Sequence, residues 1–374
     1  MRIDFYMGPE FLRTKQKTNP FFDPIIKVCE ENGIEWRVLF PGKPKACGYP
    51  ADKIASFGFW QRGSVWFWRI VHFFWHVPTW RINFLYGKIL GWFGILKSEF
   101  AITVAGWATI EVAGANPTAR IVDVQHGVIY SHHRGYFDNQ KRLSVQSQLL
   151  KNREFWLYGK GYADCFFKHP DNAKDLEGRV KVIGDVVRVN QEKCGTSGHN
   201  RGGERNLVVF SLQLTADLSP DEMARSVEKM EAFFTDFFNR FGDRYKCYVK
   251  HHPRYNKVYD LSSFYKKFPQ VTETKEQWTT LYDKMALHVT FTSTVTFDCA
   301  SQGIPTYLVE LPHADILNRD YYRDDYHYPY FDKTAEEILS MPLDEVKQSV
   351  INWYKEFYEL FDEAKCFKIL QGKV

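Results

Sequence analysis

The sequence predicts an α/β protein with two domains, and three observations carry this prediction. Short apolar runs rich in β-branched residues alternate with amphipathic segments at helical spacing, which is typical of parallel sheets covered by helices. A polar, glycine-rich stretch at 190–205 interrupts the alternation, which begins again at 207, so we expect an interdomain linker there. The length of 374 residues is long for one domain and comfortable for two.

The first domain is predicted at 1–189. A helix is expected at 20–31, where apolar residues recur at helical spacing until Asn32 and Gly33 end it. Strand, helix and strand with short connections form the usual opening of a parallel α/β domain. The strands are predicted at 2–6, 35–40, 101–104, 120–124, 154–158 and 180–183.

The segment 57–96 differs in composition from the rest of the chain. It is crowded with Trp and Phe and contains no acidic residue. A membrane-spanning helix needs about 20 mostly apolar residues, and basic residues interrupt this segment too often for that. Tryptophan combined with Arg and Lys is typical of segments that lie on a membrane surface, so we expect membrane contact here. The alternative is one or two buried helices. The basic residues that interrupt the apolar run between Asp52 and Glu99 are Arg62, Arg69, Arg81, Lys88 and Lys97.

A histidine-rich loop at 125–136 follows the predicted strand at 120–124. We expect Gly127 to let the backbone turn sharply and present His126 at the strand tip. No carboxylate or cysteine stands at ligand spacing, so the pattern does not indicate a metal site. The loop therefore predicts function rather than a structural turn, with acceptor-side roles for His126, His132, His133 and Arg134.

The second domain is predicted at 206–345. A long amphipathic helix is expected at 220–241 with Ser219 as its N-cap, and the chain is expected to be helical again at 333–361. Strands are predicted at 207–211, 246–250, 286–291 and 305–310.

The strand at 246–250 is expected to stop where two histidines and a proline begin. Proline cannot donate to a sheet ladder and restricts the residue before it. Ligands bind at the carboxyl ends of strands in open α/β sheets, so His252-Pro253 between Lys250 and Arg254 predicts a phosphate site. A structural histidine at a strand end is the alternative.

Hydroxyl side chains gather where the strand at 286–291 gives way to a helix predicted at 294–302. Thr292, Ser293 and Thr294 would combine hydroxyl donors with the free amides and the dipole of a helix start. The hydroxyls could simply cap the helix, but their position at a strand end predicts an anion site.

Together these features resemble the glycosyltransferase-B (GT-B) architecture, in which two Rossmann-like domains face each other across a cleft. The closest similarity is to bacterial capsule and lipopolysaccharide transferases that use CMP-activated acidic sugars, the sialyltransferases and Kdo transferases. Those families carry a His-Pro motif, matched by His252-Pro253, and a Ser/Thr motif, matched by Ser293 and Thr294. The resemblance implies that both motifs contact the donor phosphate. It also implies a C-terminal helix at 346–374 that crosses back onto the first domain.

A carboxylate is needed as general base or nucleophile at the sugar. Asp217, in the loop after the strand at 207–211, is the first candidate, and the resemblance to retaining Kdo transferases supports it. Asp123 and Glu111 are weaker candidates, and a solvated Asp217 is the alternative. No Asp-X-Asp occurs, so the divalent-metal clamp of the other major transferase fold has no candidate and we expect no metal.

The sequence thus predicts a metal-independent glycosyltransferase of bacterial surface polysaccharides that moves Kdo or a related acidic sugar from a CMP donor to a glycan or lipid-linked acceptor. Asp217, His126 and His252 are the predicted catalytic residues, and Lys250 joins the donor motifs. A UDP- or GDP-sugar transferase, with Glu310 at the ribose, and a CDP-glycerol-type glycerophosphotransferase remain alternatives. A noncatalytic membrane scaffold is a third.

Composition limits the partners and the compartment. The net charge of +4 is mild, and a nucleic-acid binder would show a concentrated basic face. Seven scattered cysteines argue against a zinc cluster or a disulfide framework. No apolar signal core follows the N-terminus, so we expect a cytoplasmic protein at the inner face of the membrane.

Overall fold

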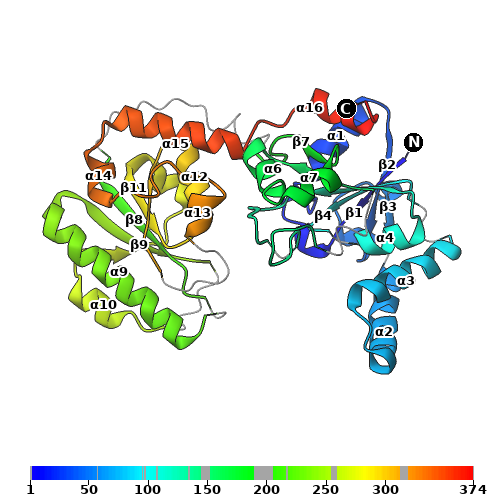
Figure 1. Ribbon diagram of the computed structural model, residues 1–374, viewed down its shortest axis with the longest axis horizontal. Helices are drawn as coiled ribbons and strands as arrows, with labels where there is room; N and C mark the ends of the chain where they lie inside the picture. The colour runs from blue at the N-terminus through cyan, green and yellow to red at the C-terminus, as the bar shows by residue number, and fades with distance from the viewer. Residues whose placement is uncertain are drawn as a thin grey trace. The chain divides into compact units, whose positions relative to one another are not determined.

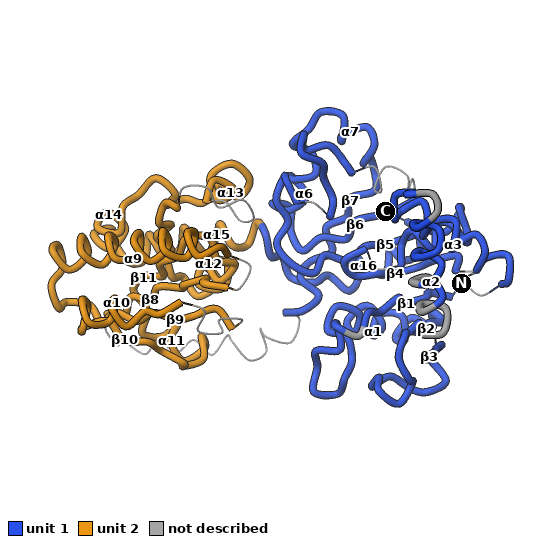
Figure 2. Tube along the Cα trace, turned by 90° about the horizontal axis from the view of Figure 1, so that it is seen from below, with its two compact units in different colours: residues 1–197, 357–374 blue, residues 198–356 orange. Residues whose placement is uncertain are grey.

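The computed structural model divides the chain into two compact units (Figures 1 and 2). Unit 1 comprises residues 1–197 and 357–374, and unit 2 comprises residues 198–356. Each unit is built around one sheet of parallel strands, so the predicted α/β class is confirmed. The structure describes residues 2–56, 58–94, 96, 98–106, 108–133, 135–144, 152–188, 205–215, 218–253, 259–311 and 319–373.

Unit 1 holds a seven-stranded sheet in the order β3-β2-β1-β4-β5-β6-β7. The chain builds three strands outward from β1 and then continues from β4 on the other side of β1, which is the Rossmann order. β4 is buried along its whole length, as expected for a parallel strand with helices on both faces. The strands are β1 (Arg2–Tyr6), β2 (Glu35–Phe40), β3 (Ile54–Ser56), β4 (Phe100–Val104), β5 (Arg120–Val124), β6 (Arg153–Leu157) and β7 (Val180–Val182).

The helices of unit 1 include one from the far end of the chain. That helix, α16, packs on α1, where Lys27 Nζ and Glu363 Oε1 form an ion pair at 2.8 Å. The segment before α16 joins the loops after β6 and β7 through a 3.0 Å hydrogen bond from Glu359 N to Tyr158 O and a bridge between Asp185 and Leu360. The described helices are α1 (Asp23–Glu31), α2 (Gly58–Trp75), α3 (Thr79–Trp92), α4 (Thr109–Ala115), α6 (Lys160–Phe166), α7 (Pro170–Leu176) and α16 (Glu363–Leu370).

Unit 2 repeats the arrangement with five parallel strands in the order β10-β9-β8-β11-β12. Its strands are β8 (Leu207–Leu212), β9 (Lys246–His251), β10 (Val271–Glu273), β11 (Met285–Thr290) and β12 (Thr306–Leu308). Its described helices are α9 (Pro220–Phe241), α10 (Ser262–Lys267), α11 (Trp278–Leu281), α12 (Val295–Ser301), α13 (Asp320–Asp324), α14 (Ala335–Ser340) and α15 (Leu343–Phe357).

The sheet of unit 2 lies between helices on both faces, with α9 and α10 on one side and α12 and α15 on the other (Figure 1). Successive strand residues point to opposite faces. Phe210 of β8 therefore packs on Phe233 of α9 at 5.8 Å between ring centroids, while Val209 joins the core beside α12. The predicted start of α9 is confirmed, because Ser219 and Glu222 form a reciprocal capping box.

The predicted element boundaries are wrong at several points. β9 runs to His251 and not Lys250, because its pairing with β8 continues to that residue. The stretch 333–361 is two helices and not one, since α14 ends at Ser340 and α15 begins at Leu343. The predicted boundary at 346 falls inside α15, whose Trp353 stacks on Phe297 of unit 2 at 4.7 Å, so only residues from 357 onward belong to unit 1. The predicted linker at 190–205 lies outside the described residues except for its last position.

Candidate functional site

The order of the strands in each sheet indicates where a ligand would bind. In unit 2 the strand order reverses between β8 and β11, and in unit 1 it reverses between β1 and β4. All strands are parallel, so their carboxyl ends share one edge in each unit. Ligands of open α/β sheets bind at that edge, beside the reversal. Residues that bind a ligand should therefore lie in the loops at the carboxyl edge of each sheet.

The carboxyl edge of unit 2 brings His252 and the hydroxyl cluster into neighbouring positions. His252 follows β9, and its backbone N–H donates to Leu212 O at the end of β8 at 3.0 Å. Ser293 follows β11, which lies on the other side of β8. Two strand spacings separate β9 from β11, or about 10 Å between backbones. The motifs around His252 and Ser293 thus flank the end of β8.

The hydroxyls at the start of α12 are not equivalent. The Ser293 side chain is buried and its Oγ accepts a hydrogen bond from Val295 N at 3.3 Å, while its carbonyl accepts one from Tyr322 Oη at 2.6 Å. Thr294 is exposed, and its side chain makes no capping bond to α12. The turn is therefore fixed by Ser293, and Thr294 presents its hydroxyl to the surface.

The side chain of Lys250 makes contacts within unit 2. Its Nζ donates to Glu276 O at 2.5 Å and lies 5.5 Å from the Trp278 ring centroid. Burial lowers the pKa of this lysine. These contacts join β9 to the loop before α11, so Lys250 has a structural role that the sequence did not predict. Pro253 is exposed directly after His252.

The adjacent histidine, His251, lines a pocket that sequence reasoning missed. The pocket has a volume of about 330 Å³ and is also lined by Tyr259, Asp260, Tyr265 and Glu273. Burial lowers the pKa of His251, and the nearby Glu273 opposes that shift. The pair His251-His252 could have indicated this pocket. Neighbouring residues at a strand end point to opposite faces of the sheet, so each histidine can line a different site at the carboxyl edge.

Glu310 lies apart from the other predicted donor residues. It is exposed two residues after β12 and lines a pocket of about 270 Å³ between α9 and the start of α14. Tyr307 and Arg240 share that pocket, whereas His252, Ser293 and Thr294 do not line it. The pocket at Glu310 therefore lies beside β12, the outermost strand on that side of the sheet, and not beside β8.

In unit 1, the buried Gln125 positions the histidine loop. Its Nε2 donates to Gly127 O at 2.7 Å, and its Oε1 accepts from Tyr158 N at 2.9 Å. The expectation for Gly127 is wrong, because its backbone is not in the left-handed region and a Cβ there would meet nothing within 4 Å. The turn is held by the amide of Gln125, which ties it to the end of β6.

His126 lies in a partly buried setting next to the loop that follows β1. The Phe11 ring meets it edge-on at 6.1 Å between centroids. Burial lowers the pKa of His126; Asp123 opposes this shift and the Arg13 guanidinium adds to it. His126 Nδ1 is buried and makes no hydrogen bond to the described residues. A neutral imidazole at neutral pH is the form that accepts a proton.

The structure brings His133 close to His126. Burial lowers the pKa of His133, and the charge of His126 lowers it further. The His133 ring lies against Tyr130 and Tyr136, at 5.1 Å and 5.0 Å between centroids. His132 is half-buried beside it. Arg134 lies outside the described residues.

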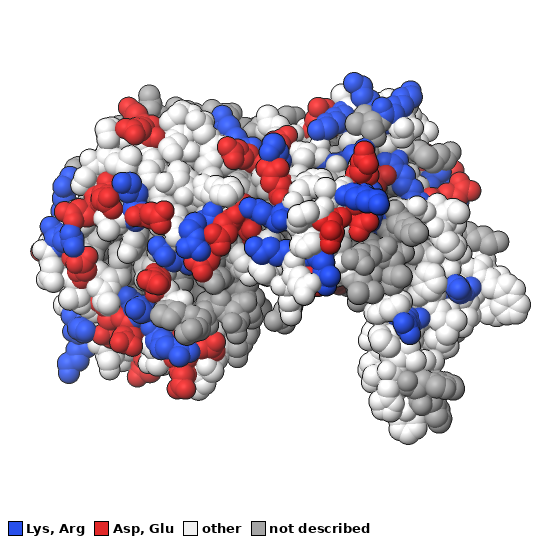
Figure 3. Space-filling view, viewed as in Figure 1, with Lys and Arg blue, Asp and Glu red and all other residues white. Residues whose placement is uncertain are grey.

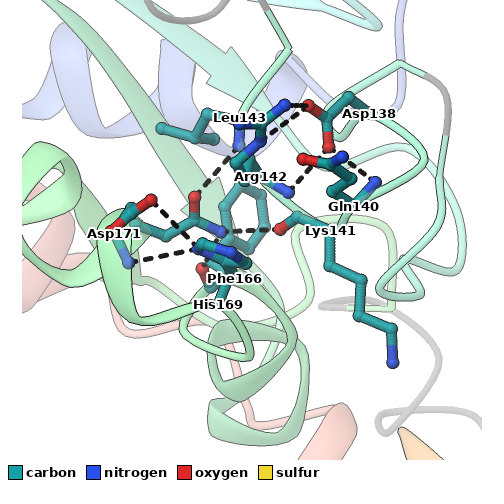
Figure 4. Close-up of polar contacts among 9 residues, drawn as sticks. Asp138, Gln140, Lys141, Arg142, Leu143, Phe166, His169 and Asp171 are labelled. Atoms are coloured by element: carbon teal, nitrogen blue, oxygen red, sulfur yellow. Dashed lines mark hydrogen bonds and ion pairs between the residues drawn. The ribbon is translucent and has the colours of Figure 1, made fainter.

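The segment 137–144, which follows the histidine loop directly, is fixed by a buried asparagine that sequence reasoning did not single out. Asn172 accepts from Leu143 N at 3.0 Å and donates to Lys141 O and Phe166 O, each at 2.9 Å. Asp138 closes the tip by accepting from the backbone of Gln140 and from Arg142 (Figure 4). These contacts hold residues 137–144 against α7 and so limit the freedom of the loop.

The three carboxylate candidates differ. One has a structural role, one has a raised pKa, and one lies outside the described residues. Asp123 is buried, pairs with Arg153 and accepts from Gly106 N at 2.8 Å, so it links β5 to the first residue of β6 and to the loop after β4. Burial raises the pKa of Glu111, on α4, to about 7. Asp217 lies outside the described residues. Among the described residues, no three His, Cys, Asp or Glu side chains gather as a metal site would require.

The sequence matches no known protein-family model and no curated protein. Solved structures nevertheless match along the whole chain. A UDP-GlcNAc 2-epimerase from Neisseria meningitidis bound to UDP-GlcNAc has 10% identity and a TM-score of 0.50, covering 100% of this chain and 99% of that one. A lipopolysaccharide outer core galactosyltransferase, WaaB, has 9% identity and a TM-score of 0.51, covering 100% of each chain. A further UDP-N-acetylglucosamine 2-epimerase has 11% identity and a TM-score of 0.51, covering 99% of this chain and 94% of that one. Identities this low establish fold alone, and the fold of this chain is GT-B, with two Rossmann-like domains.

Proposed function

We propose that this protein is a nucleotide-sugar-dependent glycosyltransferase of surface polysaccharide biosynthesis. The observation that carries the proposal is the placement of His252 and the Ser293-Thr294 turn just after the two strands that flank β8. An imidazole, a hydroxyl and backbone amides at one sheet edge supply the hydrogen-bond donors that a leaving phosphate needs. Unit 2 would bind the donor in this way without a metal ion.

We assign the donor to the pyrimidine nucleotide-sugars. The His-Pro and Ser/Thr motifs support a CMP-activated acidic sugar such as Kdo. The solved structures with the same fold include one bound to UDP-GlcNAc, which supports a UDP-sugar. The two donors share a pyrimidine ring and a phosphate ester at the anomeric carbon, and a binding panel separates them.

On the acceptor side, His126 would act as the general base. Its pKa is lowered by burial, so the imidazole is neutral at physiological pH. It would take the proton of an acceptor hydroxyl as that oxygen bonds to the anomeric carbon. The bond from the anomeric carbon to the phosphate oxygen would break, and the nucleotide would leave with the electron pair. His133 and His132 would contact the acceptor glycan.

Asp217 remains the proposed nucleophile if the reaction retains configuration. A retaining reaction would form a sugar ester on Asp217 before transfer to the acceptor. The resemblance to retaining Kdo transferases is what supports Asp217, and the anomeric configuration of the product tests it. Retention would indicate the ester on Asp217, with His126 as the base in the second step, whereas inversion would indicate direct displacement by the acceptor with His126 as the base.

A UDP-sugar 2-epimerase is the second candidate, because two of the solved structures with this fold carry that name. An epimerase needs no glycan acceptor, whereas a transferase does. The two candidates therefore differ in whether a sugar nucleotide alone is converted.

The test is to incubate the full-length protein with CMP-, UDP- and GDP-linked sugars and, separately, with CDP-glycerol, with and without an extract of lipid-linked glycans. A transferase releases nucleotide only when the glycans are present and adds mass to them. His126→Ala should then lower the rate by about a hundredfold or more, which is the usual contribution of a general base. Epimerised donor without glycan would replace the transferase proposal with the epimerase. Glycerol phosphate transfer from CDP-glycerol would indicate the glycerophosphotransferase.

A further inference from the structure

We propose that the exposed face of α2 and α3 docks on an anionic membrane surface. Both helices project from the rest of unit 1 (Figure 1). Neither they nor any other described helix is long and apolar enough to cross a bilayer. The proposed face, called here the aromatic-basic face, consists of Trp66, Arg69, Ile70, Phe73, Arg81, Leu85, Lys88, Trp92 and Phe93.

The exposed side of α3 alternates cationic and apolar residues. Arg81, Leu85, Lys88 and Trp92 follow the spacing of one helix face and are exposed, Trp92 to 84%. The opposite side of α3, which includes Leu90, is buried. α3 is therefore an amphipathic helix whose outer face carries a large aromatic ring in water.

The outer side of α2 is more apolar still. Trp66, Ile70 and Phe73 lie along one face at 64%, 54% and 75% exposure. The inner side turns toward α3, where the Phe67 ring lies 5.5 Å from that of Tyr86. Soluble surfaces rarely gather so many exposed aromatic residues, and such patches mark interaction sites.

All charged side chains of this face are positive. No acidic residue occurs between Asp52 and Glu99, and Figure 3 shows the projecting helices with blue atoms and no red ones. The Arg69 guanidinium lies 5.7 Å from the Trp66 ring centroid, and Lys88 Nζ lies 5.2 Å from that of Phe84. Cations next to aromatic rings suit the boundary between lipid headgroups and acyl chains, where rings enter and cations meet phosphates.

The face is held rigidly enough to be presented to a surface. α3 lies against α4 at backbone distance, because a Cβ on Gly87 would stand 2.2 Å from Glu111 O and one on Gly91 would stand 2.6 Å from Ala115 O. Since α3 is fixed in this way, its outer side stays exposed and does not fold back onto unit 1.

A bilayer fits this face better than a second copy of the chain does. A symmetric dimer sets the same patch against itself, and Arg69, Arg81 and Lys88 would then oppose one another without an acidic partner. An anionic bilayer supplies the opposite charge and an apolar layer together.

The test is co-sedimentation of the full-length protein with vesicles, without nucleotide, so that the result does not depend on the proposed enzymatic activity. We expect binding to phosphatidylcholine vesicles that contain phosphatidylglycerol, weaker binding to phosphatidylcholine alone, and a decline with salt. The triple variant Arg69→Gln, Arg81→Gln, Lys88→Gln should lower the partition coefficient by about a hundredfold, since each cation near the surface contributes about fivefold. The variant Trp66→Ser, Phe73→Ser, Trp92→Ser should lose binding even at low salt.

The matched control is Phe167→Ser with Leu343→Ser, which removes two hydrophobic side chains exposed elsewhere to 43% and 56%. All three variants should keep the wild-type melting temperature, because the replaced side chains are solvent-exposed. Binding that survives both face variants, or no binding to anionic vesicles, would overturn the proposal. A dimer in solution that only the face variants dissociate would identify a second copy as the occupant instead.

Discussion

His126 shows how neighbouring residues prepare one imidazole for proton transfer. Burial is the main cause that favours its neutral form; the charge of Asp123 opposes it in part, and the Arg13 guanidinium adds a smaller contribution in the direction of burial. The sequence predicted His126 but not Arg13, because the loop after β1 and the loop after β5 are more than a hundred residues apart and meet only at the folded sheet edge.

The first prediction concerns pH. A base with a lowered pKa stays neutral, and so active, at pH values below the ordinary value of about 6.5 for histidine. Arg13→Gln removes one of the two causes, so the acid limb of the kcat/KM profile should move to higher pH while the rate at pH 8 changes little. Lys15→Gln, an exposed cation of the same loop, should leave the profile unchanged. An unmoved acid limb in Arg13→Gln would contradict the role given to His126.

A second prediction at this scale concerns Asn172. Replacing it with Ala leaves the buried Leu143 N–H and two carbonyls without their partner, which should lower the free energy of unfolding by about 2–3 kcal/mol. Asn152→Ala, which removes one exposed hydrogen bond to Pro117 O, is the control and should cost less than about 1 kcal/mol. Urea unfolding measures both, and equal losses would show that Asn172 does not anchor the loop.

At the scale of elements, helix α3 depends on glycines that its sequence pattern does not explain. The composition of 57–96 predicted a membrane-surface segment or buried helices. In the structure α3 is buried along the side that packs on α4 and exposed along the other, and membrane contact stays a prediction. Periodicity identifies a buried face, but it does not identify the partner helix. Gly87 of α3 and Gly114 of α4 allow these two helices to pack closely, because a Cβ on either would come within 2.2 Å of the backbone of the other helix.

Gly87→Ala should therefore push α3 away from α4. Overpacking of this kind costs about 1–3 kcal/mol of unfolding free energy and should weaken vesicle binding, because the aromatic-basic face loses its support. Lys88→Ala, at the exposed position next to Gly87, should leave the unfolding free energy within about 0.5 kcal/mol of wild type. Urea unfolding of both variants measures the difference, and a stable Gly87→Ala protein would show that the close helix contact is dispensable.

At the scale of the whole molecule, the sequence predicted the two α/β units and the residues at the edge of unit 2, because strand ends and turn residues are local signals. It did not predict the orientation of Lys250, which depends on the carbonyl of Glu276 from another loop. It also misplaced the start of the returning segment, because α15 and α16 are both amphipathic, and tertiary contacts such as that of Trp353 with Phe297 assign α15 to unit 2. Nor did it predict that Glu310 would line a pocket between α9 and the start of α14.

The central claim is that the carboxyl edge of unit 2 binds a pyrimidine nucleotide through His252. The most direct measurement is thermal unfolding with CMP, CDP, UDP and GDP, comparing wild type, His252→Ala and Lys246→Ala, an exposed residue at the other end of β9. A nucleotide at a hundred times its dissociation constant should stabilise the fold by about 2.7 kcal/mol. We predict stabilisation by CMP or UDP in wild type and Lys246→Ala, and its loss in His252→Ala. Stabilisation that survives His252→Ala, or none with any nucleotide, would contradict the claim.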